Sequence, residues 1–132
     1  MLARKTVEGA DIQRRSFFRL ACQIPVQYRW LKKSELYRMD DGEWHAGTIC
    51  NLSGGGVLMQ SPIEMDEQDR VFITLRLAGE DLLLMGEIRI RRTGPYGEKQ
   101  YGIMFTGISM IDQDKIVRYL FQQQPRRVRV RA

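Results

Sequence analysis

Hydrophobic and polar residues alternate through much of this chain with the two-residue period of a β-strand. From Phe18 to Trp30 every even position is apolar, whereas most odd positions are polar or small. This alternation is typical of a strand with one buried face. Pro25 falls inside the stretch and cannot donate a hydrogen bond to a neighbouring strand, so we expect this strand to lie at a sheet edge or to bend there.

Five further short strands are predicted downstream, with turn residues rather than helices between them. They are expected near residues 44–52, 57–59, 71–77, 82–90 and 101–105. Residues 78–81 and 93–97 have the composition of tight reversals between neighbouring strands. In the 82–90 strand, the alternation places four apolar residues on one face and three charged residues on the other: Leu82, Leu84, Ile88 and Ile90 against Glu87, Arg89 and Arg91.

Only the end of the chain has a helical pattern. Asp112 is a suitable N-cap, and Ile116, Tyr119 and Leu120 follow at helical spacing before Pro125. Repeated antiparallel turns without intervening helices favour an all-β fold, a small and mostly closed barrel that the terminal helix plugs or flanks.

The basic residues are biased in type and in position. The 132 residues form one domain of ordinary size, with a net charge of +5 that comes from 16 Arg and only 5 Lys against 16 acidic residues. Four of the arginines lie in the last seven residues, and without them the balance is 17 basic against 16 acidic residues, or +1. A nearly neutral body disfavours a broad nucleic-acid-binding face.

Several functional classes are excluded by the residues that the sequence lacks. One histidine, His45, and two cysteines, Cys22 and Cys50, are too few for a Cys/His zinc site, and we expect both cysteines to be reduced core residues. The common motifs for nucleotide hydrolysis, dinucleotide binding, acyl transfer and zinc proteolysis are missing, so we expect no catalytic activity. No secretory h-region and no bilayer-spanning run is present, which predicts a cytoplasmic protein without membrane insertion.

Two short motifs carry the candidate chemistry. The first is Arg15-x-x-x-Arg19, and the second is Asn51-x-Ser53-x-x-Gly56. With 16 arginines, about two such Arg pairs are expected by chance, and the pair Arg127 and Arg131 is indeed a second match. The second motif is much rarer at this composition, so the combination of the two is the informative feature.

The residue types in these motifs suit a guanine nucleotide. The arginine fork donates to the O6 and N7 acceptors of guanine or to phosphate oxygens. The side-chain oxygen of Asn51 can accept from the Watson–Crick edge of guanine, although an Asp would present two acceptors where Asn presents one, and the Ser53 hydroxyl can reach phosphate or base. The glycines up to Gly56 are expected to permit positive φ and a close backbone approach.

These motifs, followed by Tyr101-Gly102-Ile103-Met104-Phe105 and a terminal helix, resemble the PilZ domain family of bacterial cyclic di-GMP receptors over about residues 12 to 124. The resemblance implies a six-stranded antiparallel split β-barrel with a C-terminal α-helix. It also implies that the N-terminal arginines wrap around the ligand while the Asn51, Ser53 and Gly56 element holds a guanine. A basic residue at Arg14 is associated in this family with a stacked pair of cyclic di-GMP molecules rather than one. No other cofactor and no metal are implied.

The resemblance also suggests a domain organisation. Residues 1–13 are expected to be a leader or linker, 14–125 the domain, and 126–132 a basic tail. The helix end is similar to that of two-domain flagellar-brake members, so the chain is either a free-standing domain or a C-terminal module. Its protein partner, whether flagellar motor, polysaccharide synthase or regulator, is not specified by the sequence. Two alternatives remain: a nucleic-acid-binding barrel that uses the Arg-rich tail, and a PilZ-like interaction module without ligand binding.

Overall fold

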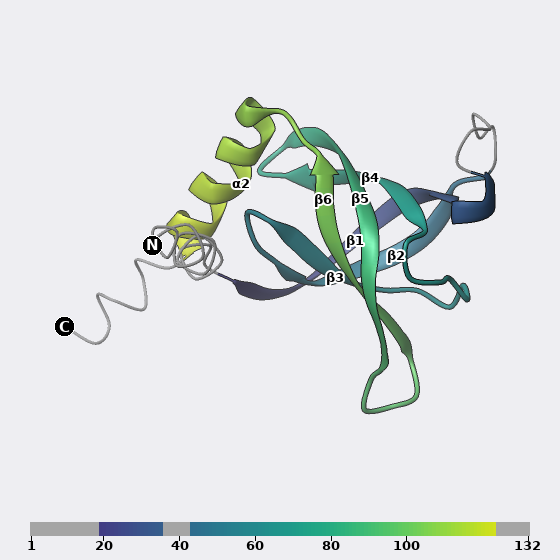
Figure 1. Cartoon of the computed structure of the whole chain (residues 1–132). Helices are drawn as coiled ribbons and strands as arrows, with labels where there is room; N and C mark the ends of the chain where they lie inside the picture. The colour runs from purple at the N-terminus through teal and green to yellow at the C-terminus, as the bar shows by residue number, and fades with distance from the viewer. Residues whose placement is uncertain (1–18, 36–42, 124–132) are drawn as a thin grey trace, which may run out of the picture.

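The computed structural model describes residues 19–35 and 43–123, which form six strands, one short 3₁₀ helix and one α-helix (Figure 1). The strands follow the predicted positions closely. Their bounds are β1 Leu20–Leu31, β2 His45–Leu52, β3 Gly56–Gln60, β4 Arg70–Leu77, β5 Glu80–Thr93 and β6 Lys99–Gly107, with the 3₁₀ helix η1 at Lys33–Glu35 and the α-helix α2 at Met110–Gln123.

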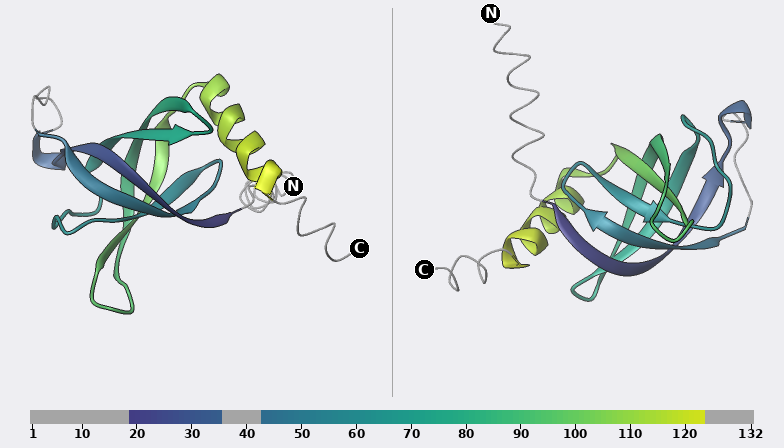
Figure 2. Two further views of the ribbon diagram at one scale, coloured as in Figure 1. Left: turned by 180° about the vertical axis from the view of Figure 1, so that it is seen from behind. Right: turned by 90° about the horizontal axis from the view of Figure 1, so that it is seen from below.

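All six strands pair antiparallel and close into a barrel in the order β1-β2-β3-β6-β5-β4 (Figures 1 and 2). Because the barrel is closed, every strand is paired on both sides over at least part of its length. Closure therefore removes most of the exposed backbone groups that promote aggregation. The predicted all-β barrel with a C-terminal helix is therefore confirmed.

Pro25 lies where only one side of β1 is paired. β1 pairs with β2 from Leu20 onward, but its ladder with β4 begins at Gln27. A register shift between Ala21 and Ile24 bends the same segment. Both the local edge and the bend that Pro25 predicted are thus present, although β1 is an internal strand of the barrel.

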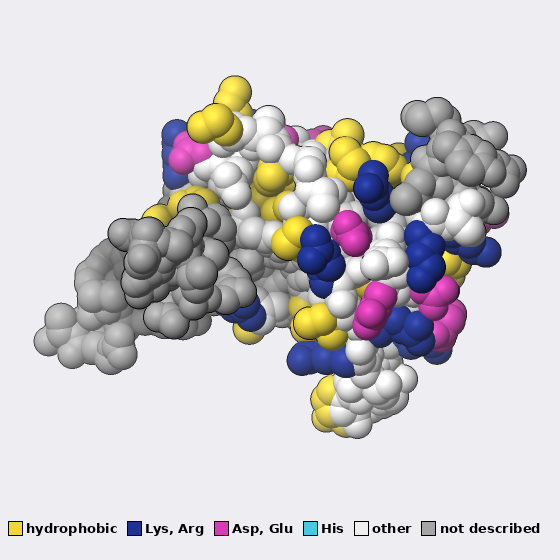
Figure 3. Space-filling model, viewed as in Figure 1, with side chains coloured by type: hydrophobic (Ala, Val, Ile, Leu, Met, Phe, Trp, Pro, Cys, Tyr) yellow, Lys and Arg dark blue, Asp and Glu magenta, His cyan; other side chains and the backbone are white. Residues whose placement is uncertain are grey.

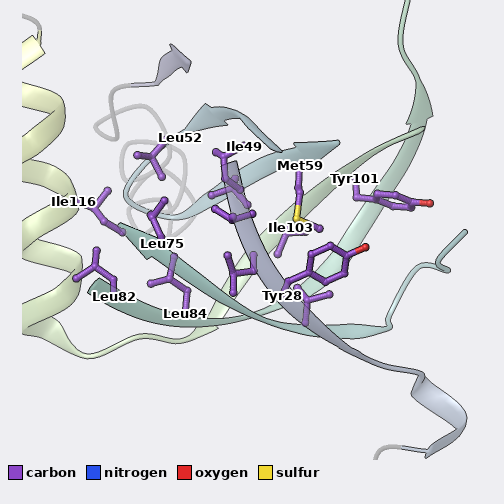
Figure 4. Close-up of a cluster of buried hydrophobic side chains, with 14 of the residues drawn as sticks. Tyr28, Ile49, Leu52, Met59, Leu75, Leu82, Leu84, Tyr101, Ile103 and Ile116 are labelled. Carbon is purple, nitrogen blue, oxygen red and sulfur yellow. The ribbon is translucent and has the colours of Figure 1, made fainter. Parts of the chain in front are cut away.

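The barrel core is closed at each end by a different element, and Figure 4 shows the end where Ile116 of α2 lies beside Leu52 and Leu82. At one end, Ile116 and Leu120 of α2 are buried against the inward side chains of the strands, among them Leu52. At the other end, the connection between β3 and β4 inserts Met65, which is 1% exposed. The β2–β3 turn therefore lies at the end of the barrel that α2 covers.

The helix begins earlier than the sequence predicts. Ser109, not Asp112, is the N-cap, because its Oγ accepts from the Asp112 N–H at 3.0 Å. Asp112 instead lies in the first turn of α2, where a carboxylate is stabilised by the helix dipole. A Ser three residues before an acidic residue is itself a capping signature, so this start was readable from the sequence.

The prediction that Ile90 lies on the buried face of β5 is wrong. Leu82, Leu84 and Ile88 point into the core as expected, but Ile90 is 58% exposed. The ladder with β6 contains a register shift between Ile88 and Ile90. A bulge of this kind inserts one extra residue and reverses which positions face outward, so the even-numbered residues after Ile88 lie on the outer face.

Candidate functional site

The barrel register brings the two sequence motifs together. Leu20 at the start of β1 is paired with Leu52 near the end of β2, so Arg19 lies across from the turn that begins at Ser53. Arg19 is exposed and makes no hydrogen bond or ion pair within the described ranges. Arg14 and Arg15 lie outside the described residues.

Ser53 organises the turn between β2 and β3. Its Oγ accepts from the Gly55 and Gly56 N–H groups, each at 3.2 Å, and donates to the Gly56 carbonyl at 3.2 Å. The Ser53 N–H also donates to that carbonyl at 3.0 Å. A hydroxyl has one donor and two acceptor sites, so the turn uses the full capacity of the Ser53 side chain.

Gly56 is required by a close backbone approach and not by a left-handed conformation. A Cβ at this position would lie 2.2 Å from the Ile103 carbonyl oxygen of β6. The residues with positive φ in the described part of the chain are Gln68, Ala78, Gly79 and Gly97. The expectation of positive φ in the 54–56 glycine run is therefore wrong, because β6 passes so close that only a missing side chain is demanded there.

The turn is held from two sides. The Phe105 N–H of β6 donates to the Gly55 carbonyl at 3.0 Å. From the helix, Nε2 of Gln113 donates to the Gly54 carbonyl at 2.9 Å. Three consecutive glycines would otherwise leave this segment with high conformational entropy, so these bonds give the site a fixed backbone.

Asn51 presents a free amide beside this fixed turn. It lies half-buried on the outer face of β2, after a register shift in the ladder with β3. Its side chain makes no hydrogen bond to any part of the chain that the structure describes. Its carbonyl oxygen and NH₂ group are therefore available to an external partner, and Arg19 supplies positive charge just before the adjoining strand β1.

The cysteines do not add redox or metal chemistry to the site. Cys22 and Cys50 are both free thiols, but neither is a buried core residue: both are half-buried, and only Cys22 packs against the core. Burial raises the pKa of each. A raised pKa keeps them protonated and poorly nucleophilic at neutral pH. No cluster of metal-ligating side chains occurs among residues 19–35 and 43–123.

An open groove of about 470 Å³ continues along the barrel away from the β2–β3 turn. It is formed by the start of β2, the end of β3 and the β5–β6 hairpin, which projects from the barrel in Figures 1 and 2. The lining residues are Ala46, Gly47, Thr48, Gln60, Ser61, Pro62, Gly97, Glu98 and Lys99. Sequence reasoning did not find this groove, because it depends on how the hairpin lies over β2 and β3.

The combination of a six-stranded barrel, an arginine before β1 and an Asn-x-Ser-x-x-Gly turn agrees with the comparison to known families. The family model described as "PilZ domain" matches residues 13–122. The chain belongs to the PilZ family. PilZ domains are ligand-binding domains without catalytic activity, and the match indicates no enzymatic family.

Solved structures with the same fold support this assignment at the level of architecture. The Bacillus subtilis inhibitor of motility (MotI/DgrA) has a TM-score of 0.71 and 17% identity, with 86% of this chain and 53% of that chain covered. The PilZ domain of YcgR from Escherichia coli, solved with c-di-GMP, has a TM-score of 0.59 and 17% identity, with 90% and 97% covered. The PilZ domain of CeSA from a cellulose-synthesizing bacterium has a TM-score of 0.54 and 22% identity, with 81% and 98% covered.

The matches cover different shares of the solved proteins. This PilZ chain spans about half the length of the B. subtilis protein, so the match covers one part of that protein. No curated protein matches the sequence. Among the described residues, no helix combines the length and hydrophobicity needed to cross a membrane.

Proposed function

We propose that this PilZ domain is a non-catalytic receptor for cyclic di-GMP. The observation that carries the proposal is the Leu20–Leu52 register, which sets Arg19 beside the Ser53–Gly56 turn and the free Asn51 amide. The YcgR PilZ domain solved with c-di-GMP shares the fold. We assign the function to residues 14–125, with 1–13 as a leader and 126–132 as a basic tail.

In this proposal the motif residues have different roles. Arg15 and Arg19 donate to guanine edges or phosphates, and Asn51 accepts from a guanine. Ser53 and Gly56 act mainly by fixing the turn on which Asn51 depends, since the Ser53 hydroxyl is already fully bonded there.

Ligand binding is proposed to order the arginine segment before β1 against the turn and so to change the surface offered to a protein partner. That shift is limited to the difference in ligand affinity between the two states of the segment. A motility, biofilm or exopolysaccharide output fits such a device, and the partner is a protein of one of those systems.

Calorimetric titration with cyclic di-GMP tests the proposal directly. We expect binding in the micromolar range, which corresponds to about −8 kcal/mol. Arg19→Ala and Asn51→Ala should each weaken binding without changing the unfolding midpoint. Arg76→Ala is the matched control, because Arg76 is an exposed arginine of β4 paired with Asp81. No heat at hundreds of micromolar ligand would overturn the proposal.

The stoichiometry of the same titration tests the role of Arg14. Two ligands per chain, reduced to one by Arg14→Ala, would support binding of a stacked pair. One ligand per wild-type chain would contradict it. A parallel titration with cyclic di-AMP should give much weaker binding, since adenine lacks the O6 acceptor and the N1 and N2 donors of guanine.

A further inference from the structure

Three arginines near the end of β5 have different surroundings. Arg91 donates to Asp66 at 2.8 Å and to Glu64 at 2.9 Å, so its charge is matched by the β3–β4 connection. Arg89 lies 3.7 Å from Glu87 on its own strand. Arg92 has no acidic partner within the described residues, and its Nε donates to Oε1 of Gln100 on β6 at 2.8 Å.

Charge density alone does not distinguish these residues. Figure 3 shows Lys and Arg side chains scattered over the visible face of the barrel, with acidic and hydrophobic side chains between them. The distinguishing features of Arg92 are its direction and its anchor, and both follow from the backbone.

The bulge in β5 determines that direction. Ile88 is fully buried and pairs with Ile103, whereas Ile90 is 58% exposed and pairs with Gly102. Two residues further on, Arg92 pairs with Gln100. Because side chains alternate along a strand, Arg92 lies on the same outer face as Ile90. Without the bulge it would point to the barrel interior.

The outer face between Arg92 and the motif turn consists of two adjacent rows of paired residues. One row runs Asn51, Leu58, Gly102, Ile90 across β2, β3, β6 and β5. The next row runs Thr48, Gln60, Gln100, Arg92 across the same four strands. Arg92 and Asn51 therefore lie at opposite ends of neighbouring rows, three strand spacings across and one row along, on the order of 16 Å apart along the surface.

Side chains along the second row bridge that separation. Gln100 is only 7% exposed although it faces outward, and its bond to Arg92 draws the guanidinium back over β6. From the other end, the Cys50 thiol lies 3.9 Å from Oε1 of Gln60. Burial and Glu98 raise the pKa of the Cys50 thiol and the Arg92 charge lowers it in part, which is consistent with Arg92 lying on the same side of the barrel as this residue next to Asn51.

The row that runs from Asn51 toward β5 is apolar. Gly102 has no side chain, and a Cβ there would meet Ile90 only at an ordinary contact distance of 3.4 Å. Leu58 on one side is half-buried. An apolar strip of Leu58, Gly102 and the 58% exposed Ile90, with an amide at one end and a guanidinium at the other, is suited to a base with polar edges.

We propose that Arg92, held by Gln100, is a further ligand-binding arginine that contacts the phosphate or the O6/N7 edge of the guanine extending from Asn51 across Gly102. The inference rests on the proposed cyclic di-GMP function and extends it. Gln100 accepts from the Nε–H of Arg92, which is one of its five guanidinium N–H groups. The two terminal NH₂ groups are left to donate together as a fork. Gln100 is a positioning residue and makes no contact with the ligand.

Titration of the full chain with cyclic di-GMP separates this inference from the proposed function. Arg92→Ala should raise the Kd about tenfold or more, the range expected for loss of a bidentate contact. Arg89→Ala is the matched control, a neighbouring exposed arginine of β5 that should change the Kd less than twofold. Wild-type binding with the same Kd for Arg92→Ala would overturn the inference and leave the proposed function intact. Absence of binding by the wild type would overturn both.

Two further variants test the chemistry and the positioning. Arg92→Lys keeps the charge but not the planar fork, so it should restore only a small part of the lost affinity. Gln100→Leu should weaken binding in the wild type but have no additional effect in Arg92→Ala, because its contribution passes through Arg92. Equal losses from Gln100→Leu in both backgrounds would show that Gln100 acts structurally and would contradict the assignment.

Discussion

Within the Asn-x-Ser-x-x-Gly motif, each small residue meets a separate physical demand. Ser53 satisfies backbone groups that a glycine-rich turn leaves without partners, and Gly56 allows β3 to approach β6. Asn51 alone has a side chain that makes no hydrogen bond within residues 19–35 and 43–123. The motif therefore combines one presenting residue with a scaffold that keeps it in place.

Gly56→Ala should destabilise the domain strongly. The added Cβ would overlap the Ile103 carbonyl oxygen at 2.2 Å, and all three of its nearest atoms belong to the β6 backbone, which cannot move aside as a side chain could. We expect a loss of about 1–3 kcal/mol or more in the free energy of unfolding, measured by urea denaturation. Gly102→Ala is the control, because its Cβ would meet Ile90 at 3.4 Å. Equal stability of the two variants would show that the approach at Gly56 is not limiting.

Ser53→Ala should cost about 1 kcal/mol of stability, because two N–H groups and one carbonyl of the turn lose their hydroxyl partner. Ser53→Thr keeps the hydroxyl and should recover most of that loss. The affinity for cyclic di-GMP, measured by calorimetry, should follow the same order: Ser53→Ala binds more weakly than the wild type, and Ser53→Thr recovers most of the affinity. Wild-type stability in Ser53→Ala would mean that the glycine turn holds its shape without the side chain.

The motif residues could be named from the sequence, but the reasons for some of them could not. Positive φ was a reasonable expectation for a run of glycines, yet Gly56 is fixed by a strand that lies about 47 residues further along the chain. Arg92 was indistinguishable from Arg89 and Arg91 in the sequence. Their separation depends on a bulge, and bulges leave little trace in an alternating pattern.

At the scale of elements, the β2–β3 turn is a junction between the barrel and α2. β6 holds Gly55 and α2 holds Gly54, while Lys115 ties the helix to Glu80 at the β4–β5 hairpin with a contact of 2.7 Å. The hydrogen bond to Glu80 raises the pKa of Lys115. A displacement of the turn on ligand binding would therefore strain or break the hydrogen bond between Gln113 of α2 and the Gly54 carbonyl.

Gln113→Ala tests this junction. We expect a loss of about 0.5–1.5 kcal/mol in stability, the usual contribution of one hydrogen bond, together with faster hydrogen exchange at residues 54–56. Gln122→Ala is the control, because Gln122 is exposed on the same helix. If amide exchange in the turn were unchanged in Gln113→Ala, the helix would not restrain it.

The order and type of the elements were predictable because each strand repeats an inward-facing apolar pattern, and the terminal helix has its own period. Element boundaries were less accurate where short-range polar contacts decide them. Asp112 is a suitable N-cap by type, but Ser109 reaches the free N–H groups first and begins the helix three residues earlier. The closure of the barrel adds contacts between distant strands that no local pattern contains.

At the scale of the whole molecule, the two ends of the barrel differ in the residues and contacts that they contain. The end covered by α2 holds the motif residues Arg19, Asn51 and Ser53, whereas Arg92 lies toward the opposite end, which is closed by a network around the buried Asp69. There Asp69 accepts from Trp30 Nε1, the Lys33 N–H and the Asp66 N–H, each at 2.9 Å. The motif end can therefore change its contacts on ligand binding while the hydrogen bonds to Asp69 keep the opposite end of the barrel closed.

Two buried tyrosines at that opposite end make stability depend on pH in the alkaline range. The Tyr28 hydroxyl bonds Ser61 at 2.6 Å, and the Tyr101 hydroxyl donates to the Ile63 carbonyl at 2.5 Å. Burial raises the pKa of both phenols above the ordinary value of 10.0. In the unfolded chain they lose their protons first, so the folded state binds more protons once the pH exceeds about 10.

The free energy of unfolding should accordingly be unaffected by these groups below pH 10 and should fall as the pH rises from 10 through the raised values. Tyr28→Phe removes one of the two groups, so its stability should fall less steeply than that of the wild type between pH 10 and 11, measured by urea denaturation at each pH. Tyr96→Phe serves as the control, since Tyr96 is 93% exposed on the hairpin and should leave the wild-type slope unchanged. The two cysteines, whose raised pKa values act in the same direction from about pH 9, are present in all three proteins and cancel in the comparison. Parallel curves for the wild type and Tyr28→Phe would show that the Tyr28 phenol ionises as readily in the folded barrel as in the unfolded chain.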